Sequence, residues 1–335
     1  MLSRHFLRSK VLQAIYAGRC IETSRLRDIE TSRLRDFETS RLRAFEYHIA
    51  KLNELGVLQV ALLPRFVEEG VEMLEGGKRK FRPTEEDRNP SMKMQDNEFV
   101  RRMTDNFELK KYLEQWGGCW ETHEDLIKES FMDFRKGDEY RRYVEDKESS
   151  YEKDKDFAIQ LFRFLMNREA LRAVVAERSL LWEDDFDQIA QYNFMMLKTL
   201  DEENFDEAMM WPVMYDKRQE KDESDMDFAR QLLRDTIATR EESEELIKSH
   251  LQGWEFDRVS KMDILLINMA VAEFTGCPTI PEKVTVDEYI ELSKEFSSER
   301  SKLFINGILD KLVSELRSKG RIQKSGRGLM GGEEI

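Results

Sequence analysis

The sequence has few of the residues that stop helices or cross-link small folds. It contains 6 prolines, 16 glycines and 3 cysteines in 335 residues. This scarcity, with abundant Glu, Lys, Arg, Leu and Met, favours an all-helical protein. Cys20, Cys119 and Cys277 are scattered and odd in number, so they predict no metal-ligand cluster and indicate a reducing compartment, the cytoplasm.

Several functional signatures are also missing. No run of about 18 apolar residues occurs, so we expect no membrane span. The sequence lacks an HExxH pair, a nucleophile elbow and a glycine-rich dinucleotide turn. We therefore predict a protein that is not an enzyme, with no catalytic residues, no metal site and no cofactor.

Charge is plentiful but unevenly placed. Charged residues make up 36% of the chain, against about 25% in ordinary globular proteins. The net charge is −14, yet residues 1–46 carry +4 and residues 311–330 carry +5, which leaves −23 for the rest. This asymmetry permits an anionic ligand at the ends and a basic partner on the body.

The basic N-terminal segment allows two interpretations. Residues 1–17 contain no acid and place their apolar residues at helical spacing. They could form a mitochondrial transit peptide or the first helix of the mature fold. An octad repeat follows in residues 22–46, and because eight residues overshoot two helical turns, its leucines cannot share one buried stripe. We expect a solvated helix or loop there.

The middle of the chain predicts further helices and linkers. Residues 45–73 look helical with an interruption at Pro64, and Gly76-Gly77 predicts a helix end. A polar linker at 78–95, helices near 97–116, 121–135 and 150–166, and an acidic linker at 201–224 follow. Residues 155–161 match 226–232, and Trp182-Glu183 matches Trp254-Glu255, which suggests a duplicated helical unit or a coincidence of two amphipathic segments.

The C-terminal stretch 277–316 is the most informative. Thr285 and Glu288 form an S/T-x-x-E capping box that predicts a helix start. Ser297-Ser298 should end that helix and supply the next N-cap. The second helix then has apolar residues at close to ideal helical spacing: Ile305, Ile308, Leu309, Leu312, Val313 and Leu316. Two antiparallel helices joined by a polar turn are expected.

The order of features from residue 225 to 316 resembles the NusB family of transcription antitermination factors. The resembling motifs are F-x-x-x-L-L from Phe228, WEFDRV at 254–259, MDILLINMA at 262–270, and SKLFINGILDK at 301–311. Arg4, Arg8 and Gln13 are similar to the arginine-rich first helix of that family, which favours a first helix over a transit peptide. Residues 21–224 exceed the usual family length and resemble an enlarged form.

The resemblance implies an all-α NusB-like helical bundle with an enlarged helical insertion. Residues 1–20 would be its basic first helix, 21–46 the octad segment, 47–224 the insertion with a duplicated unit at 150–200, 225–320 the C-terminal domain, and 321–335 a flexible tail. It also implies a function. Such proteins pair with the ribosomal protein NusE, bind the single-stranded boxA element of nascent ribosomal RNA, and join the elongation complex of RNA polymerase.

The resemblance and the charges together predict two sets of binding residues. Cations on one helix face can position phosphates, and an aromatic ring at the edge of a core stripe can stack on a base. The predicted RNA-binding residues are Arg4, His5, Arg8, Lys10, Gln13, Arg300, Lys302 and Phe304. The predicted NusE-binding residues are Asp257, Asp263 and Asn268, with the two acids expected to be exposed.

Two other functions stay open at this point. His5 and Phe6 stand where the family often has arginines, so a protein-interaction scaffold of the same fold with weak or lost RNA binding is the main alternative. An organellar import or adaptor protein is the third interpretation.

Overall fold

The computed structural model describes residues 3–22, 31–116, 120–179, 182–205, 225–251 and 256–330. All regular secondary structure in these ranges is helical, which confirms the predicted all-α fold. No helix among them is long and apolar enough to cross a membrane. The elements, with 3-10 helices labelled η, are α1 (Arg4–Glu22), α2 (Thr31–Gly77), α3 (Glu85–Arg88), α4 (Glu98–Asp105), α5 (Phe107–Trp116), η1 (Trp120–Thr122), α6 (Glu124–Phe134), α7 (Asp138–Glu145), α8 (Tyr151–Met166), α9 (Glu169–Arg178), α10 (Phe186–Thr199), α12 (Asp225–Ala238), α13 (Arg240–His250), η3 (Phe256–Arg258), α14 (Lys261–Gly276), α15 (Glu282–Phe296), α16 (Ser301–Ser318) and η4 (Gly326–Leu329).

The chain forms two compact units. The first unit consists of Met1–Tyr47 and Tyr215–Ile335, and the second of His48–Met214. The long helix α2 contributes residues to both units. Octad residues 31–46 are helical within α2, whereas residues 23–30 of the repeat lie outside the described residues.

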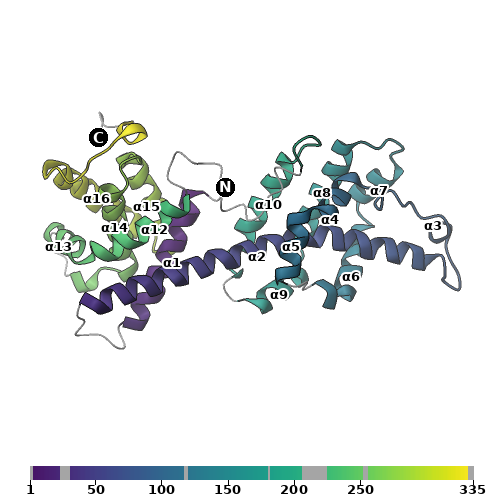
Figure 1. Ribbon diagram of the computed structural model, residues 1–335, viewed down its shortest axis with the longest axis horizontal. Coiled ribbons are helices and arrows are strands. Elements are labelled where there is room, and N and C mark those ends of the chain that lie inside the picture. Colours follow the sequence, from purple (N-terminus) through teal and green to yellow (C-terminus); the bar gives the residue numbers. More distant parts are fainter. Residues whose placement is uncertain are drawn as a thin grey trace. The chain divides into compact units, whose positions relative to one another are not determined.

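Helix α14 is the centre of the first unit. Every residue from Asp263 to Phe274 is buried, as expected for a helix that is apolar on nearly all sides. Helices α1, α12, α13, α15 and α16 pack against it (Figure 1). The predicted stripe of α16, from Ile305 to Leu316, is buried, which confirms that this face of the helix belongs to the core.

The second unit is built on α2 and α8. Helices α4, α6, α7, α9 and α10 pack against α8. Phe66 of α2 meets Phe131 and Phe134 of α6 in edge-to-face contacts at centroid distances of 5.7 and 5.8 Å, a geometry that aromatic rings prefer. The predicted interruption at Pro64 is wrong, because α2 continues through it. Its neighbours Leu63 and Phe66 are completely buried, and their packing offsets the lost helical hydrogen bond.

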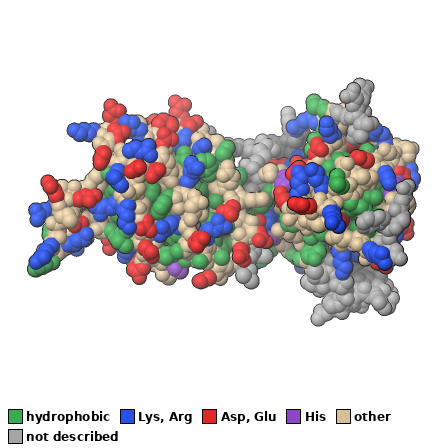
Figure 2. Space-filling view, turned by 180° about the vertical axis from the view of Figure 1, so that it is seen from behind, with side chains coloured by type: hydrophobic (Ala, Val, Ile, Leu, Met, Phe, Trp, Pro, Cys, Tyr) green, Lys and Arg blue, Asp and Glu red, His purple; other side chains and the backbone are tan. Residues whose placement is uncertain are grey.

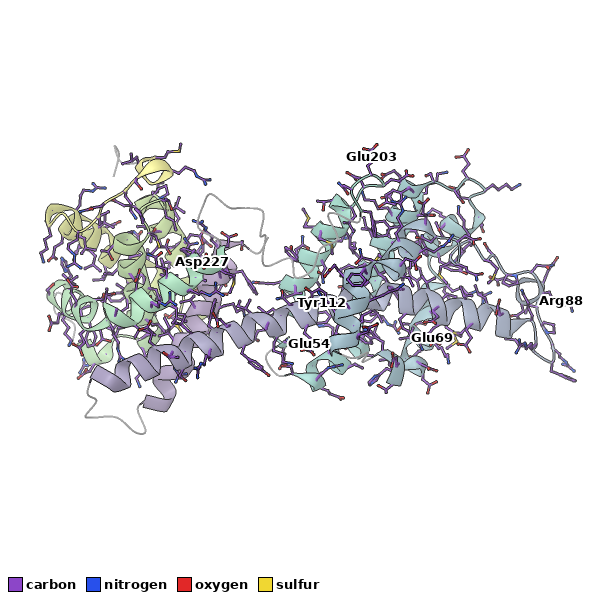
Figure 3. All side chains as sticks on the ribbon, viewed as in Figure 1. Glu54, Glu69, Arg88, Tyr112, Glu203 and Asp227 are labelled. Carbon is purple, nitrogen blue, oxygen red and sulfur yellow. The ribbon has the colours of Figure 1, made fainter. Side chains whose placement is uncertain are left out.

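On the face of the second unit that Figure 2 shows, charged side chains of both signs are interspersed. Two carboxylates of α2, Glu54 and Glu69, are nevertheless buried (Figure 3). Glu69 pairs with Arg65 and lies 3.4 Å from the Nζ atom of Lys128. Buried carboxylates are stable only with such partners.

Several local predictions for the second unit need correction. The helix predicted at 97–116 is divided at Asn106, whose side-chain oxygen accepts a hydrogen bond from the backbone of Leu109 and so starts a new helix. Helix α7 was not predicted. The helix end at Gly77 is confirmed. Of the acidic linker predicted at 201–224, residues 206–224 lie outside the described residues.

The suspected duplication has a partial counterpart in the structure. Helices α8, α9 and α10 follow one another in the second unit as α12, α13 and α14 do in the first. Phe157 and Leu161 are buried, as are their matches Phe228 and Leu232. Trp182 is buried, but its match Trp254 lies outside the described residues. The duplication therefore stays a hypothesis.

Candidate nucleic-acid interface

Helix α1 lies in the first unit with its apolar face inward. Leu7, Val11, Leu12 and Ile15 are all buried, and the helix packs against α12, α14 and α15. The cations between these apolar residues therefore approach three neighbouring helices rather than solvent alone. The partners of each cation decide what this helix can offer to RNA.

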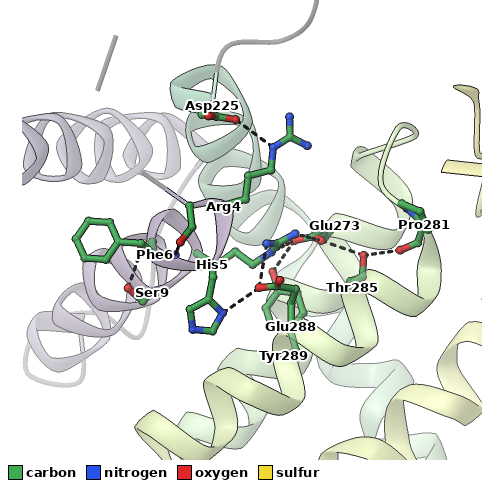
Figure 4. A network of polar contacts seen from close by, with 12 residues as sticks. Arg4, His5, Phe6, Ser9, Asp225, Glu273, Pro281, Thr285, Glu288 and Tyr289 are labelled. Carbon is green, nitrogen blue, oxygen red and sulfur yellow. Dashed lines mark hydrogen bonds and ion pairs between the residues drawn. The ribbon is translucent and has the colours of Figure 1, made fainter. Parts of the chain in front are cut away.

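Arg8 is almost completely buried, with 1% of its surface exposed. Its Nε and Nη2 atoms donate to the two carboxylate oxygens of Glu273 at 2.8 and 2.7 Å. Glu273 also accepts hydrogen bonds from the hydroxyls of Thr285 at 2.9 Å and Tyr289 at 3.1 Å (Figure 4). These donors satisfy a carboxylate that has no exposed surface, which is the condition for keeping a charge in a core.

The same contacts determine the protonation states of Arg8 and Tyr289. Burial alone would lower the pKa of Arg8, but the hydrogen bonds and negative charge of Glu273 outweigh it and raise the pKa. Burial, followed by the charge of Glu273, raises the pKa of Tyr289 well above its ordinary value. Arg8 therefore stays charged, and Tyr289 stays a hydroxyl donor, throughout the physiological pH range.

Arg4 and His5 also face acids of neighbouring helices. The Nε atom of Arg4 donates to Asp225 of α12 at 3.2 Å. The two ring nitrogens of His5 contact Glu288 and Glu295 of α15, each at 2.9 Å. The hydrogen bond with Glu288 raises the pKa of His5 to about 9, against the opposing effect of burial. His5 is therefore a cation that bridges two carboxylates at neutral pH.

The raised pKa of His5 predicts a pH-dependent stability. A histidine whose pKa rises from 6.5 to about 9 on folding contributes stability that is fully present below pH 6.5 and is lost as the pH passes through about 9. We expect the stability difference between the protein and His5→Gln to shrink steadily from pH 6.5 to pH 9.5 in denaturant titrations. A difference that is constant over this range would contradict the bridging role.

Lys10 and Gln13 contact each other. The Nζ atom of Lys10 donates to the Gln13 side-chain oxygen at 2.8 Å and lies 4.9 Å from the ring centroid of Phe6. Lys10 is 2% exposed. Although residues 1–17 contain no acid, Arg4 and Arg8 have acidic partners from distant parts of the sequence. RNA contact by Arg8 would first require its release from Glu273.

The start of α16 is the exposed part of the predicted interface. Arg300 and Lys302 are exposed, and Phe304 is half-buried beside the fully buried Ile305. Lys302 and His5 both act on Glu291, whose pKa is lowered first by Lys294 and then by these two cations. Side chains two residues apart do not share a helix face, so Lys302 and Phe304 lie on different faces of α16.

Comparison with known proteins identifies the family. Residues 185–314 match the model of the NusB family. A stretch of 116 residues is 41% identical to the transcription antitermination protein NusB of Salinibacter ruber and covers 35% of this chain and 72% of that protein. The chain belongs to the NusB family.

A second relative in the NusB family gives a shorter match. The transcription antitermination protein NusB of Chloroherpeton thalassium is 36% identical over 104 residues, which cover 31% of this chain and 49% of that protein. No solved structure matched the chain. The NusB model begins in the second unit, at Asp185, and ends in α16.

The three predicted NusE-binding residues do not lie on one surface of this NusB-family chain. Asp257 is exposed in η3. Asp263 is 5% exposed and accepts a hydrogen bond of 2.5 Å from the Ser297 hydroxyl, so its expected exposure is wrong. It stands in the first turn of α14, where the helix dipole favours an acid. Asn268 is buried, and its amide has no hydrogen-bond partner among the described residues.

The helix starts of the C-terminal stretch differ from the predicted caps. Helix α15 begins at Glu282 after Pro281, so Thr285 is not its N-cap. The Thr285 hydroxyl instead donates to Glu273, which is a stronger use of a buried hydroxyl than capping. Helix α15 ends at Phe296 as predicted, but Arg300 rather than a serine precedes α16.

Glu273 is the important residue to which the sequence analysis assigned no role. Its signal was a single acid within the apolar run from Ile264 to Phe274. A carboxylate in a helix that is buried on all sides needs a cation from elsewhere. Arg8 provides that cation from a position 265 residues away in the chain.

The tail is attached to the first unit where the structure describes it. The backbone N–H of Ser325 donates to the Pro278 carbonyl at 3.0 Å, and Lys324 donates to the Cys277 carbonyl at 3.0 Å. Gly328 lies so close to Pro278 that an added Cβ atom would be 2.0 Å from its carbonyl oxygen. The flexibility predicted for residues 321–335 stays a prediction. Residues 331–335 lie outside the described part of the chain.

Proposed function

We propose that this NusB-family protein is an RNA-binding transcription antitermination factor. It binds boxA-type sequences of nascent ribosomal RNA together with the ribosomal protein NusE and acts on the elongation complex of RNA polymerase, in the cytoplasm and without catalysis. Family membership and the names of both relatives support the antitermination role. The RNA-binding part of the proposal rests on one feature of the first unit.

That feature is a face of α16 formed by Arg300, Phe304, Gly307 and Lys311. These positions are spaced by four, three and four residues, so they share one side of the helix. The backbone N–H of Phe304 donates to the Arg300 carbonyl at 3.5 Å, which brings Arg300 into the helical register. Arg300, Gly307 and Lys311 are exposed, and Phe304 is half-buried at the edge of the core.

The chemistry of this face fits a short single strand of RNA. Arg300 and Lys311 are eleven residues apart, which is about 16 Å along a helix and is long enough for about two or three nucleotides. The two cations can position phosphates, and the Phe304 ring can stack on a base between them. An added Cβ atom at Gly307 would have no neighbour within 4 Å, so the strand can approach the helix closely there.

Helix α1 has an indirect role in this proposal. Arg8, His5 and Arg4 use their charges to hold α14, α15 and α12. Since α15 packs against α16, α1 supports the helices that present the RNA-binding face. Lys302, which is exposed on a different face of α16 from Phe304, would assist by attracting the strand rather than by stacking or direct positioning.

NusE would bind at a separate surface of the first unit. Asp257 is the exposed acid among the three predicted residues, and we propose that it faces the basic partner. Asp263 and Asn268 would support this surface from within, because both lie in the buried helix α14. An exposed charge pair contributes less than about 1 kcal/mol, so Asp257 would add specificity more than affinity.

A scaffold without RNA binding is the second candidate function. It is favoured by the engagement of Arg4 and Arg8 in internal ion pairs and by the net charge of −14. In that case the protein would bind NusE or another partner, and an RNA strand would add nothing to the affinity.

A binding titration separates the two candidates. We would measure the anisotropy of a labelled boxA-like RNA against the protein with NusE, at several salt concentrations, with a scrambled strand as the control. The RNA-binding proposal expects preference for the boxA-like strand. It also expects the logarithm of the binding constant to fall with the logarithm of the salt concentration, with a slope of about −1.4 or steeper from two phosphate contacts. Equal, weak binding of both strands would favour the scaffold.

A further inference from the structure

A basic loop joins α2 to α3 in the second unit. Its residues are Lys78, Arg79, Lys80, Phe81 and Arg82, and all five are exposed. Phe81 has 97% of its surface exposed, the highest value among the exposed large hydrophobic residues of the described chain. An apolar ring that is bare of contacts between cations contributes nothing to folding, so this pattern needs an explanation other than the core.

The backbone of the basic loop is well held although its side chains are exposed. The N–H groups of Lys78, Arg79 and Lys80 donate to the carbonyls three residues before them, at 3.2, 3.0 and 3.2 Å. These bonds continue the end of α2 as a tight turn. The loop is therefore a preformed shape, and binding to it would cost little conformational entropy.

Asp87 stabilises the basic loop through hydrogen bonds. It forms a capping box with Thr84, with bonds of 3.0 and 3.1 Å, and accepts a hydrogen bond of 2.8 Å from Lys80 Nζ. Gly77 packs so closely that an added Cβ atom would lie 3.0 Å from the Asp87 carboxylate. One cation of the loop is thereby used to position it.

The other three cations are not paired in this way. The ion pairs of the described residues include none for Lys78, Arg79 or Arg82. Most other cations of the second unit pair with acids, as Arg65, Lys128 and Lys153 do. Basic side chains gather with an apolar tip at the end of this unit where α2 ends, on the left of Figure 2, near Arg88 of Figure 3.

We propose that the basic loop binds single-stranded RNA, with phosphates at Lys78, Arg79 and Arg82 and a base stacked on Phe81. This contact goes beyond the proposed boxA site, because it lies in the second unit and needs neither NusE nor a particular sequence. Cations that track a backbone beside an exposed aromatic ring are the usual means of sequence-tolerant strand binding.

An RNA strand fits this loop better than a membrane does. Glu75 and Glu85 border the loop in the sequence, and Glu85 and Glu86 are exposed. A flat anionic surface would meet these acids together with the cations, whereas a narrow strand can follow the cations alone. A single phenylalanine is also a small anchor for a bilayer, but it is sufficient to stack one base.

Photo-crosslinking of the full-length protein tests this proposal. The probe is an oligouridine of about ten nucleotides containing 4-thiouridine, used without NusE. Cleavage after glutamate yields the peptide 76–85, which contains the whole basic loop. We expect crosslinks in this peptide and an affinity about tenfold weaker in Phe81→Ala. The 97% exposure of Phe81 means that this variant keeps its fold.

Charge variants supply the matched comparison. Lys78→Gln/Arg79→Gln/Arg82→Gln should lower the log–log salt slope by about 2. The control Arg101→Gln/Lys147→Gln/Lys198→Gln removes the same charge from exposed positions of the same unit and should leave the slope nearly unchanged. Equal effects of the two triple variants, or no crosslink in peptide 76–85, would overturn the proposal.

Two further measurements distinguish this proposal from the boxA proposal and from membrane binding. Phe304→Ala/Arg300→Gln removes the proposed boxA face, and the crosslink in peptide 76–85 should persist in that variant, whether or not the boxA proposal holds. Binding to phosphatidylserine vesicles that is lost in the loop variant, without crosslinking to RNA, would assign the loop to a membrane and overturn the RNA proposal.

Discussion

Glu273→Gln should lower the free energy of unfolding of the first unit by about 3 kcal/mol or more. The change keeps the size of the side chain but removes the buried counter-ion of Arg8, which is 1% exposed, and leaves it only the half-buried Glu288 at 3.2 Å. Removal of one partner of a buried ion pair is costly because the remaining charge stays away from water. Hydrogen exchange of the α14 amides measures this loss within the first unit.

Two variants make the comparison specific. Glu69→Gln removes a buried carboxylate of the second unit, which pairs with Arg65 and Lys128, and should leave the α14 amides unaffected. Arg8→Met/Glu273→Gln removes both charges. The amide oxygen still accepts from one of the two hydroxyls of Thr285 and Tyr289, and the amide NH2 group can donate to the other, so this variant should recover much of the lost stability. Full protection of α14 in Glu273→Gln alone would show that the ion pair is not needed.

Phe304→Ala should weaken the binding of boxA-like RNA with NusE about tenfold, since stacking of one base contributes about 1–3 kcal/mol. Phe304→Leu retains apolar packing at the edge of the core but loses the aromatic face, and we expect a similar loss of affinity. The ring's half-buried position means that thermal melting must be measured alongside the anisotropy titrations.

The charges on the same face provide an independent check. Arg300→Gln/Lys311→Gln should lower the log–log salt slope by about 1.4. Lys283→Gln changes one exposed cation in the first turn of α15, outside the proposed face, and should change the slope little. If Phe304→Leu binds RNA as well as the unmodified protein, stacking on Phe304 is not part of the interaction.

The sequence predicted most helices because their signals are local. The apolar spacing of α16 and the glycine pair at the end of α2 act within a few residues, and both predictions are confirmed. The predicted interruption at Pro64 is wrong because the packing of buried neighbours offsets the lost helical hydrogen bond, and a local rule does not include that packing. The predicted N-cap at Thr285 is wrong because its hydroxyl donates to Glu273 of α14, a partner that the capping motif does not include.

The site was harder to predict because its charges are satisfied over long distances. Arg8 and Arg4 have no acid nearby in the sequence, yet their partners, Glu273 and Asp225, lie more than two hundred residues away. Helical spacing did identify Phe304 as a residue at the edge of the core. It could not show that His5 bridges Glu288 and Glu295, because that depends on how α1 packs against α15.

The central claim is that Arg8 supports the fold while the exposed face of α16 binds RNA. The most direct test is the RNA affinity of Arg8→Met/Glu273→Gln with NusE, measured under conditions where hydrogen exchange shows an intact α14. We predict an affinity within about twofold of the unmodified protein, because no phosphate contact is removed. A folded variant that loses RNA binding by tenfold or more would place Arg8 in the RNA interface and contradict this account.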